Sequence, residues 1–191
     1  MRRAVAVIVL LLVVGGIAVV GSLLVHGIST REEPTHAEVA IARMLRHFAV
    51  PAKLRAMKNP IAVSPAALQE AREHFADHCA QCHGNDGRGQ TEMGRSLDPK
   101  APDMTLAETQ DLSDGELFAI IRNGVRLTGM PGWAGDHTVA DDWKLVLFIR
   151  HVPHMTKEEA ESMKALNPVS PMEMREQQEE RDFLNGGGAH E

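Results

Sequence analysis

Large aromatic rings are scarce in this sequence. Its 191 residues include no tyrosine, two tryptophans and five phenylalanines, so aromatic residues make up only 4% of the chain. Aromatic side chains supply much of the core volume of a small domain. A domain that has so few of them needs another source of apolar volume, and a bound apolar group is one such source.

Cysteine and positive charge are also in short supply. Two cysteines cannot build a disulfide framework. The chain has 20 Lys and Arg against 26 Asp and Glu, a net charge of −6, and no basic run, which argues against nucleic-acid binding. The hydrophobic fraction of 43% and the charged fraction of 24% are those of a globular protein.

One long apolar segment, residues 4–25, is predicted to span a membrane. It contains no charged side chain, and 22 helical residues at about 1.5 Å each cover a bilayer core of about 30 Å. Arg2 and Arg3 precede it, so the positive-inside rule keeps the amino terminus in the cytoplasm and exports the rest. A cleaved signal peptide is the alternative, but its apolar region is shorter and ends at a small-residue site.

The exported part is predicted to be all-α, because it shows helical periodicity, no β alternation and no internal repeat. Helix starts are marked by capping residues or a first-turn proline at four places, Thr35 with Glu38, Ser64-Pro65, Ser113 with Glu116, and Thr156 with Glu159. A further helix carries Trp143 and ends at Pro153. Residues 84–109 lack a sustained period and are predicted to be a long loop.

Four regions follow from this pattern. Residues 1–28 form the cytoplasmic tip and anchor, residues 29–61 a juxtamembrane helix and spacer, and residues 62–155 the central domain. Residues 156–191 form a helical extension, in which 171–184 is either a loosely docked helix or a contact arm and the last residues are disordered.

The most specific motif is Cys79-Ala80-Gln81-Cys82-His83. Cys-x-x-Cys-His is the attachment signature of haem c, in which two thiols bond the porphyrin vinyl groups and the histidine binds the iron. Chance placement of two cysteines and ten histidines gives the pattern about once in two thousand chains. A thiol redox site lacks its βαβ context, a zinc site lacks a second ligand pair, and a plain disulfide leaves His83 unexplained.

Residues 64–153, about half of the chain, resemble a class I c-type cytochrome. The resemblance rests on residues 79–84, 86–89, 121–124 (Ile-Arg-Asn-Gly), 128–133 (Thr-Gly-Met-Pro-Gly-Trp) and a closing helix from Trp143 to His151. It implies that Met130 is the second axial ligand. It also implies that a proline after the haem motif offers its carbonyl to the His83 imidazole, which fits Pro102 better than Pro99.

The residues themselves also single out Met130. Most of the ten methionines are expected to fill the core, whereas Met130 lies in a loop that Gly129, Pro131 and Gly132 can hold on a tight path. Met93 and Met104 are alternative ligands. Ligation by a second histidine would instead use one of three downstream residues, His137, His151 or His154.

Further residues are expected around the haem. The indole N–H of Trp133 could bond a haem propionate. Apolar contacts are expected from six side chains, Phe75, Leu97, Met104, Ile120, Ile121 and Val125.

These features predict a membrane-anchored electron carrier rather than an enzyme. A methionine opposite the histidine raises the reduction potential and fills the sixth position, where oxygen or peroxide would otherwise bind. We expect one covalent haem c on the periplasmic side of a bacterial inner membrane and membrane-bound redox partners in a respiratory chain. Alternatives are a fixed subunit of an oxidoreductase, a haem peroxidase or gas-binding protein, and an anchor protein whose cysteines form only a disulfide.

Replacing Cys79 or Cys82 with alanine should prevent stable maturation, because the chain without its haem lacks a sufficient core. The measurement is the amount of coloured, membrane-extracted protein per cell. Wild-type yield from the Cys79→Ala variant would contradict covalent attachment.

Overall fold

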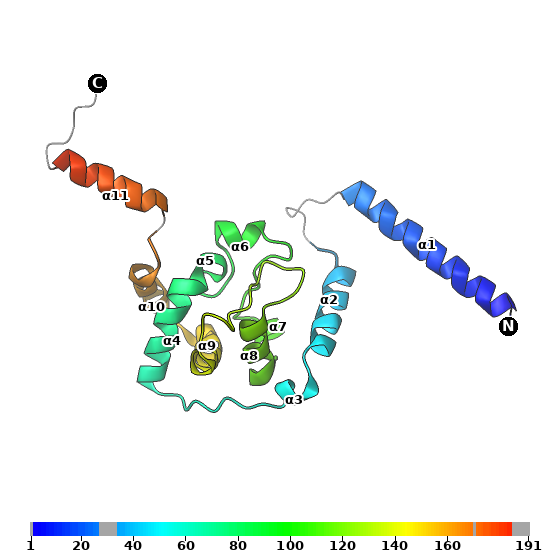
Figure 1. Ribbon diagram of the computed structural model, residues 1–191, viewed down its shortest axis with the longest axis horizontal. Coiled ribbons are helices and arrows are strands. Elements are labelled where there is room, and N and C mark those ends of the chain that lie inside the picture. Colours follow the sequence, from blue (N-terminus) through cyan, green and yellow to red (C-terminus); the bar gives the residue numbers. More distant parts are fainter. Residues whose placement is uncertain (1, 27–33, 170, 185–191) are drawn as a thin grey trace, which may run out of the picture.

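The computed structural model describes residues 2–26, 34–169 and 171–184, and the secondary structure of this part of the chain is entirely helical (Figure 1). The predicted all-α class is therefore confirmed. The longer helices are α1 (Arg2–His26), α2 (His36–Ala49), α4 (Pro65–His78), α8 (Asp114–Asn123), α9 (Val139–His151) and α11 (Pro171–Leu184). Shorter elements are α3 (Ala52–Arg55), α5 (Ala80–His83), α6 (Glu92–Ser96), α7 (Ala107–Gln110), α10 (Lys157–Ser162) and the 3-10 turns η1 (Val152–His154) and η2 (Met163–Leu166).

Helix α1 contains the predicted membrane-spanning segment. Its residues from Arg2 to Ser22 are long and apolar enough to cross a bilayer, and none of them is buried against the rest of the structure. The helix projects from the packed helices, as does α11 at the other end of the chain (Figure 1). The tail that is predicted to be disordered lies outside the described residues.

The predicted helix starts are confirmed by their capping bonds. The backbone N–H of Thr35 donates to the Glu38 carboxylate over 2.6 Å, and Ser113 and Glu116 form the same reciprocal box. The Ser64 hydroxyl accepts from the N–H of Ala67 at the start of α4. Each cap satisfies backbone donors that a helix start would otherwise leave unpaired.

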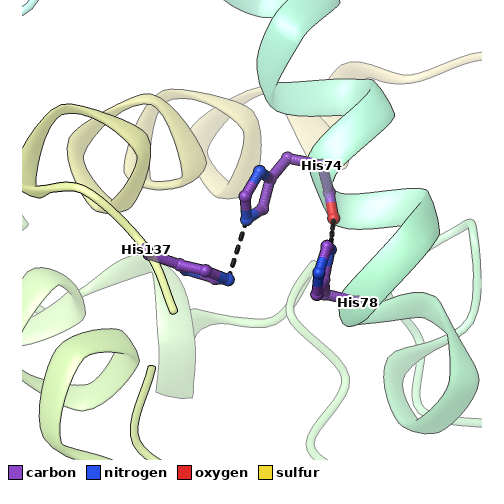
Figure 2. Close-up of side chains that lie close together, drawn as sticks. All are labelled: His74, His78 and His137. Carbon is purple, nitrogen blue, oxygen red and sulfur yellow. Dashed lines mark hydrogen bonds between the residues drawn. The ribbon is translucent and has the colours of Figure 1, made fainter. Parts of the chain in front are cut away.

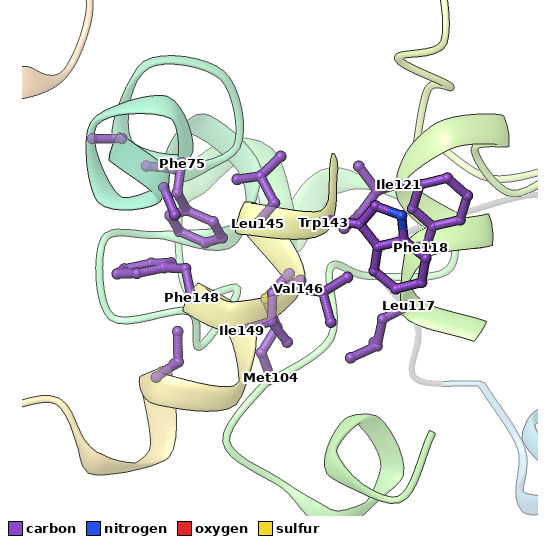
Figure 3. Close-up of a cluster of buried hydrophobic side chains, with 14 of the residues drawn as sticks. Phe75, Met104, Leu117, Phe118, Ile121, Trp143, Leu145, Val146, Phe148 and Ile149 are labelled. Carbon is purple, nitrogen blue, oxygen red and sulfur yellow. The ribbon is translucent and has the colours of Figure 1, made fainter. Parts of the chain in front are cut away.

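The core lies between α4, α8 and α9 (Figure 3). Phe75 of α4 meets Phe148 of α9 with ring centroids 4.9 Å apart, and Phe118 of α8 stacks on Trp143 of α9 at 4.3 Å. Four of the seven aromatic rings thus pack where α9 meets α4 and α8. The contact of Phe75 with Phe148 fixes the position of the end of α4.

The packed unit extends beyond residue 155. Met163 in η2 is fully buried in the same core. Glu159 of α10 accepts from Arg72 of α4 over 2.6 Å and contacts His151 of α9 at 3.0 Å. Residues 157–166 therefore brace the helix that leads into the Cys-x-x-Cys-His motif.

Helices α2 and α3 are more than a spacer, because they contact the central domain. Arg43 pairs with Glu108 at 3.3 Å, and His47 lies 3.2 Å from Glu116. The carbonyl of Leu54 lies so close to α8 that a Cβ on Gly115 would come within 1.8 Å of its oxygen. The juxtamembrane segment thus holds a defined place on α7 and α8.

Met163→Ala should lower the free energy of unfolding by about 2–5 kcal/mol, since it empties a buried site. The exposed Met174→Ala in α11 is the matched control and should change it by less than about 0.5 kcal/mol. Chemical denaturation of the detergent-extracted protein measures both. Equal effects would show that η2 is not part of the cooperative core.

Candidate functional site

The two cysteines lie at the junction of α4 and α5. Cys79 closes α4 through a 2.9 Å bond from its N–H to the carbonyl of Phe75, and the N–H of His83 returns to the Cys79 carbonyl over 2.9 Å. Cys82 and His83 therefore follow Cys79 on a single helical turn. The haem motif thus sits directly on the core junction between α4 and α9.

Both thiols are free and protonated in this environment. Burial raises the pKa of Cys79 to about 12, with a further rise from Cys82, and burial also raises the pKa of Cys82. Thiol–disulfide exchange needs a thiolate, which such groups do not supply at neutral pH. The pair is therefore poorly suited to redox exchange of its own.

His83 is a buried neutral imidazole, 7% exposed. Burial lowers its pKa to about 4, and the backbone carbonyl of Pro102 opposes this shift only in part. The Nδ1 atom is buried without a hydrogen bond of normal geometry, so the Pro102 contact is incomplete. An imidazole that stays neutral at pH 7 keeps an unprotonated nitrogen for a metal ion.

Gly89 brings the Pro102 segment against His83. Its N–H donates to the His83 carbonyl over 2.7 Å, and its φ of +68° belongs to the left-handed region that favours glycine. A Cβ at this position would lie 2.2 Å from the carbonyl oxygen of Ala101. Of the two candidate prolines, Pro102 is the one whose carbonyl acts on the imidazole.

The region predicted to be a long loop contains the short helices α6 and α7. Thr91 caps α6 by accepting from the N–H of Gly94 at 2.8 Å, and its hydroxyl donates to the Cys82 carbonyl at 3.0 Å. These helices have one turn each and are too short to show a periodic pattern, so the sequence could not reveal them. Helix α6 covers the outer side of α5.

The Met130 loop is pinned to the end of α8. The carbonyl of Met130 accepts from the N–H of Val125 at 3.1 Å, and the N–H of Met130 donates to the Thr128 hydroxyl at 3.0 Å. Two residues later, a Cβ on Gly132 would lie 2.6 Å from the Asn123 carbonyl carbon. The half-buried Met130 side chain is thus presented by a tightly fixed backbone.

The alternative ligands lie in other surroundings. Met104 is buried in the core, and Met93 is 43% exposed on α6. His137 is buried against Asp142, and His151 contacts Glu159. Met130 accordingly remains the predicted partner of His83.

Trp133 and the six side chains expected to contact the haem differ in how deeply they are buried. The half-buried Trp133 indole stacks on His137 with centroids 4.8 Å apart, so its bond to a propionate stays a prediction. Leu97, Ile120 and Val125 are half-buried. Phe75, Met104 and Ile121 lie in the core, and the contact of these six side chains with a haem stays a prediction.

The donor set fits haem c. It combines two adjacent thiols, a buried neutral imidazole, and a thioether on a fixed loop, which are the groups that attach and ligate this cofactor.

Comparison with known proteins agrees with this chemistry. Residues 66–149 match the family described as cytochrome c oxidase, cbb3-type, subunit III. A relative named Cbb3-type cytochrome c oxidase subunit FixPc, from Rhizobium leguminosarum bv. viciae, is 37% identical over 94 residues, covering 44% of this chain and 28% of the relative. The subunit FixP from Rhizobium meliloti (strain 1021) is 39% identical over 80 residues, covering 39% and 25%. The matched part thus spans only about a quarter of either relative.

Gly124→Ala should destabilise the protein by about 1–3 kcal/mol from backbone strain alone, since φ is +67° there. The new Cβ would also lie 2.6 Å from the Met130 carbonyl oxygen and displace the loop. Gly135→Ala is the control, because nothing lies within 4 Å of its Cβ. Unfolding by denaturant compares the two variants, and a Gly124→Ala variant as stable as Gly135→Ala would contradict this account of the loop.

Proposed function

We propose that residues 66–149 of this chain form a c-type cytochrome domain and that the protein transfers single electrons between redox partners through one haem c. The match of these residues to the family described as cytochrome c oxidase, cbb3-type, subunit III supports the proposal. The observation that carries the proposal is the placement of Cys79, Cys82 and the buried neutral His83 on one helical turn. A bound haem supplies an iron that changes its oxidation state by one electron.

Each residue of the site has a proposed role. The thiols of Cys79 and Cys82 form thioethers, which retain the cofactor in an open compartment. His83 would give the iron an imidazole nitrogen, and the Pro102 carbonyl would orient the ring through Nδ1. Met130 would give the iron a thioether sulfur, which would favour the ferrous state relative to a second imidazole and leave no site for an added ligand.

The anchor sets where the transfer takes place. Helix α1 is apolar along its length, and Arg2 and Arg3 lie at its start. By the positive-inside rule the cytochrome domain faces the exported side, which is the periplasm when the membrane is a bacterial inner membrane. Anchoring confines diffusion to the membrane plane, which suits exchange with membrane-bound partners.

A second candidate function is that of a fixed subunit of a membrane oxidoreductase. Two observations favour it. The relatives are named as subunits of a cbb3-type oxidase. The outer face of α2 also exposes four large apolar side chains that no described part of the chain covers, Ile41, Met44, Leu45 and Phe48. Extraction in mild detergent separates the two functions, because a subunit co-purifies with partners at fixed stoichiometry and a carrier is isolated alone.

Met130→Ala should lower the reduction potential and open the sixth position. The reduced wild-type protein should show no prompt spectral change with carbon monoxide, whereas the variant should bind it at once. Met93→Ala, on the exposed side of α6, is the matched control and should behave as wild type. Prompt binding by the wild type would favour a gas-binding protein or peroxidase. A normal potential in Met130→Ala together with a lowered one in His137→Ala would assign the ligand to His137.

A further inference from the structure

Three histidines meet beside the haem motif, and none of them has a role in the proposed haem site (Figure 2). His74 and His78 lie one turn apart on α4, and His137 comes from the loop between Met130 and α9. One ring nitrogen from each lies within 4.8 Å of the other two, and the Nε2 atoms of His74 and His137 are 2.8 Å apart. Such convergence of imidazole nitrogens is typical of a metal site.

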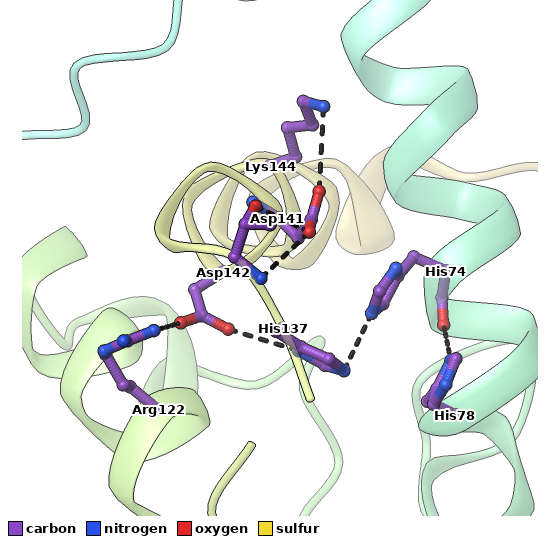
Figure 4. A network of polar contacts seen from close by, with 8 residues as sticks. His74, His78, Arg122, His137, Asp141, Asp142 and Lys144 are labelled. Carbon is purple, nitrogen blue, oxygen red and sulfur yellow. Dashed lines mark hydrogen bonds and ion pairs between the residues drawn. The ribbon is translucent and has the colours of Figure 1, made fainter. Parts of the chain in front are cut away.

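A carboxylate orients the His137 ring (Figure 4). The Nδ1 atom of His137 lies 3.2 Å from the fully buried carboxylate of Asp142, which Arg122 also pairs with at 2.8 Å. The Nδ1 atom of His78 lies 3.2 Å from the Asp77 carboxylate. A carboxylate on the far nitrogen fixes the ring and raises its basicity, as it does for histidines that bind zinc. The Nε2 atom of His137 then faces the Nε2 atom of His74, with which it shares a hydrogen bond.

The surroundings favour entry of a cation. A surface hollow that includes His74 is otherwise lined by Leu166 and four carboxylates, Glu70, Glu73, Asp77 and Asp141. Lys144 pairs with Glu70 and lies 3.8 Å from Asp141, so it offsets only part of this negative charge. Burial, with the neighbouring His137 and His78, lowers the pKa of His74, so its ring is neutral at pH 7.

We propose that His74, His78 and His137 bind a divalent transition-metal ion of the zinc class. Three imidazole ligands suit zinc or copper rather than calcium or magnesium, which prefer oxygen ligands. With zinc–nitrogen bonds of about 2.0–2.1 Å, tetrahedral ligand nitrogens lie roughly 3.3 Å apart. The hydrogen-bonded His74 and His137 nitrogens, 2.8 Å apart, are about half an ångström closer than that spacing, and all three nitrogens lie within 4.8 Å of one another, so the ion requires the rings to rotate and replaces this hydrogen bond.

The site joins the two segments that carry the proposed axial ligands. His78 directly precedes Cys79, and Trp133, three residues after Met130, stacks on His137 and meets the His78 ring edge-on at 5.3 Å. A bound ion would link α4 to the Met130 loop and place two positive charges close to the haem. The added charge raises the reduction potential, because it destabilises ferric haem, which carries one more positive charge than ferrous haem. This effect on the potential rests on the proposed function.

The test uses the untagged, haem-loaded full chain in detergent, treated with a chelator and then titrated with zinc chloride by calorimetry. We expect one saturable site per chain, and zinc X-ray absorption should show three histidine nitrogens. His74→Ala and His78→Ala should each weaken binding at least about tenfold. His154→Ala, an exposed histidine outside the cluster, is the matched control and should bind zinc as the wild type does.

Haem absorbance and thermal unfolding in chelator establish that each variant is folded. His137→Gln repeats the test from the loop side if an α4 variant fails to fold. Absence of saturable zinc binding, or binding that survives both His74→Ala and His78→Ala, overturns the site. Zinc binding without a rise in the reduction potential supports the metal site and contradicts its coupling to the haem. A chain that binds zinc but no haem contradicts only the proposed function.

Discussion

Burial of His83 is the constraint on which the rest of the site depends. His83 lies on α5, which follows directly on the end of α4, so its ring stays buried because that end is held in place. The contact of Phe75 with Phe148 holds it. The loop behind the ring can close on it only because Gly89 accepts a left-handed backbone and a very close neighbour. The packing of the core is therefore also what buries the His83 ring in this chain.

Most of the few aromatic rings in this chain lie in the core between the helices. Phe75, Phe118, Trp143 and Phe148 are committed to the helix junction, so few rings are left to cover a flat cofactor. Leu97 and Val125, two of the aliphatic side chains expected to contact the cofactor, are half-buried. Leu97 also lies against Gly129, where a Cβ would come within 2.6 Å of it, which ties the first long loop to the Met130 loop.

Local features of the fold could be predicted from the sequence, because caps and apolar runs act over a few residues. The starts of α2, α4 and α8 and the apolar helix α1 are examples. Contacts between distant segments could not be predicted. The burial of Met163, the place of α2 on α8, and the meeting of His74 with His137 depend on how helices pack, and a single sequence carries no pattern for them. The axial role of Met130 stays a prediction, although its loop has the fixed backbone that the role requires.

The proposed function requires that a haem is bonded to this chain through Cys79 and Cys82. Denaturing electrophoresis of the exported protein followed by haem staining detects such a bond. A stained band at the mass of the chain, with a pigment that acidified acetone does not extract, is the predicted result. A colourless protein, or a pigment that dissolves in the acetone, would contradict the account.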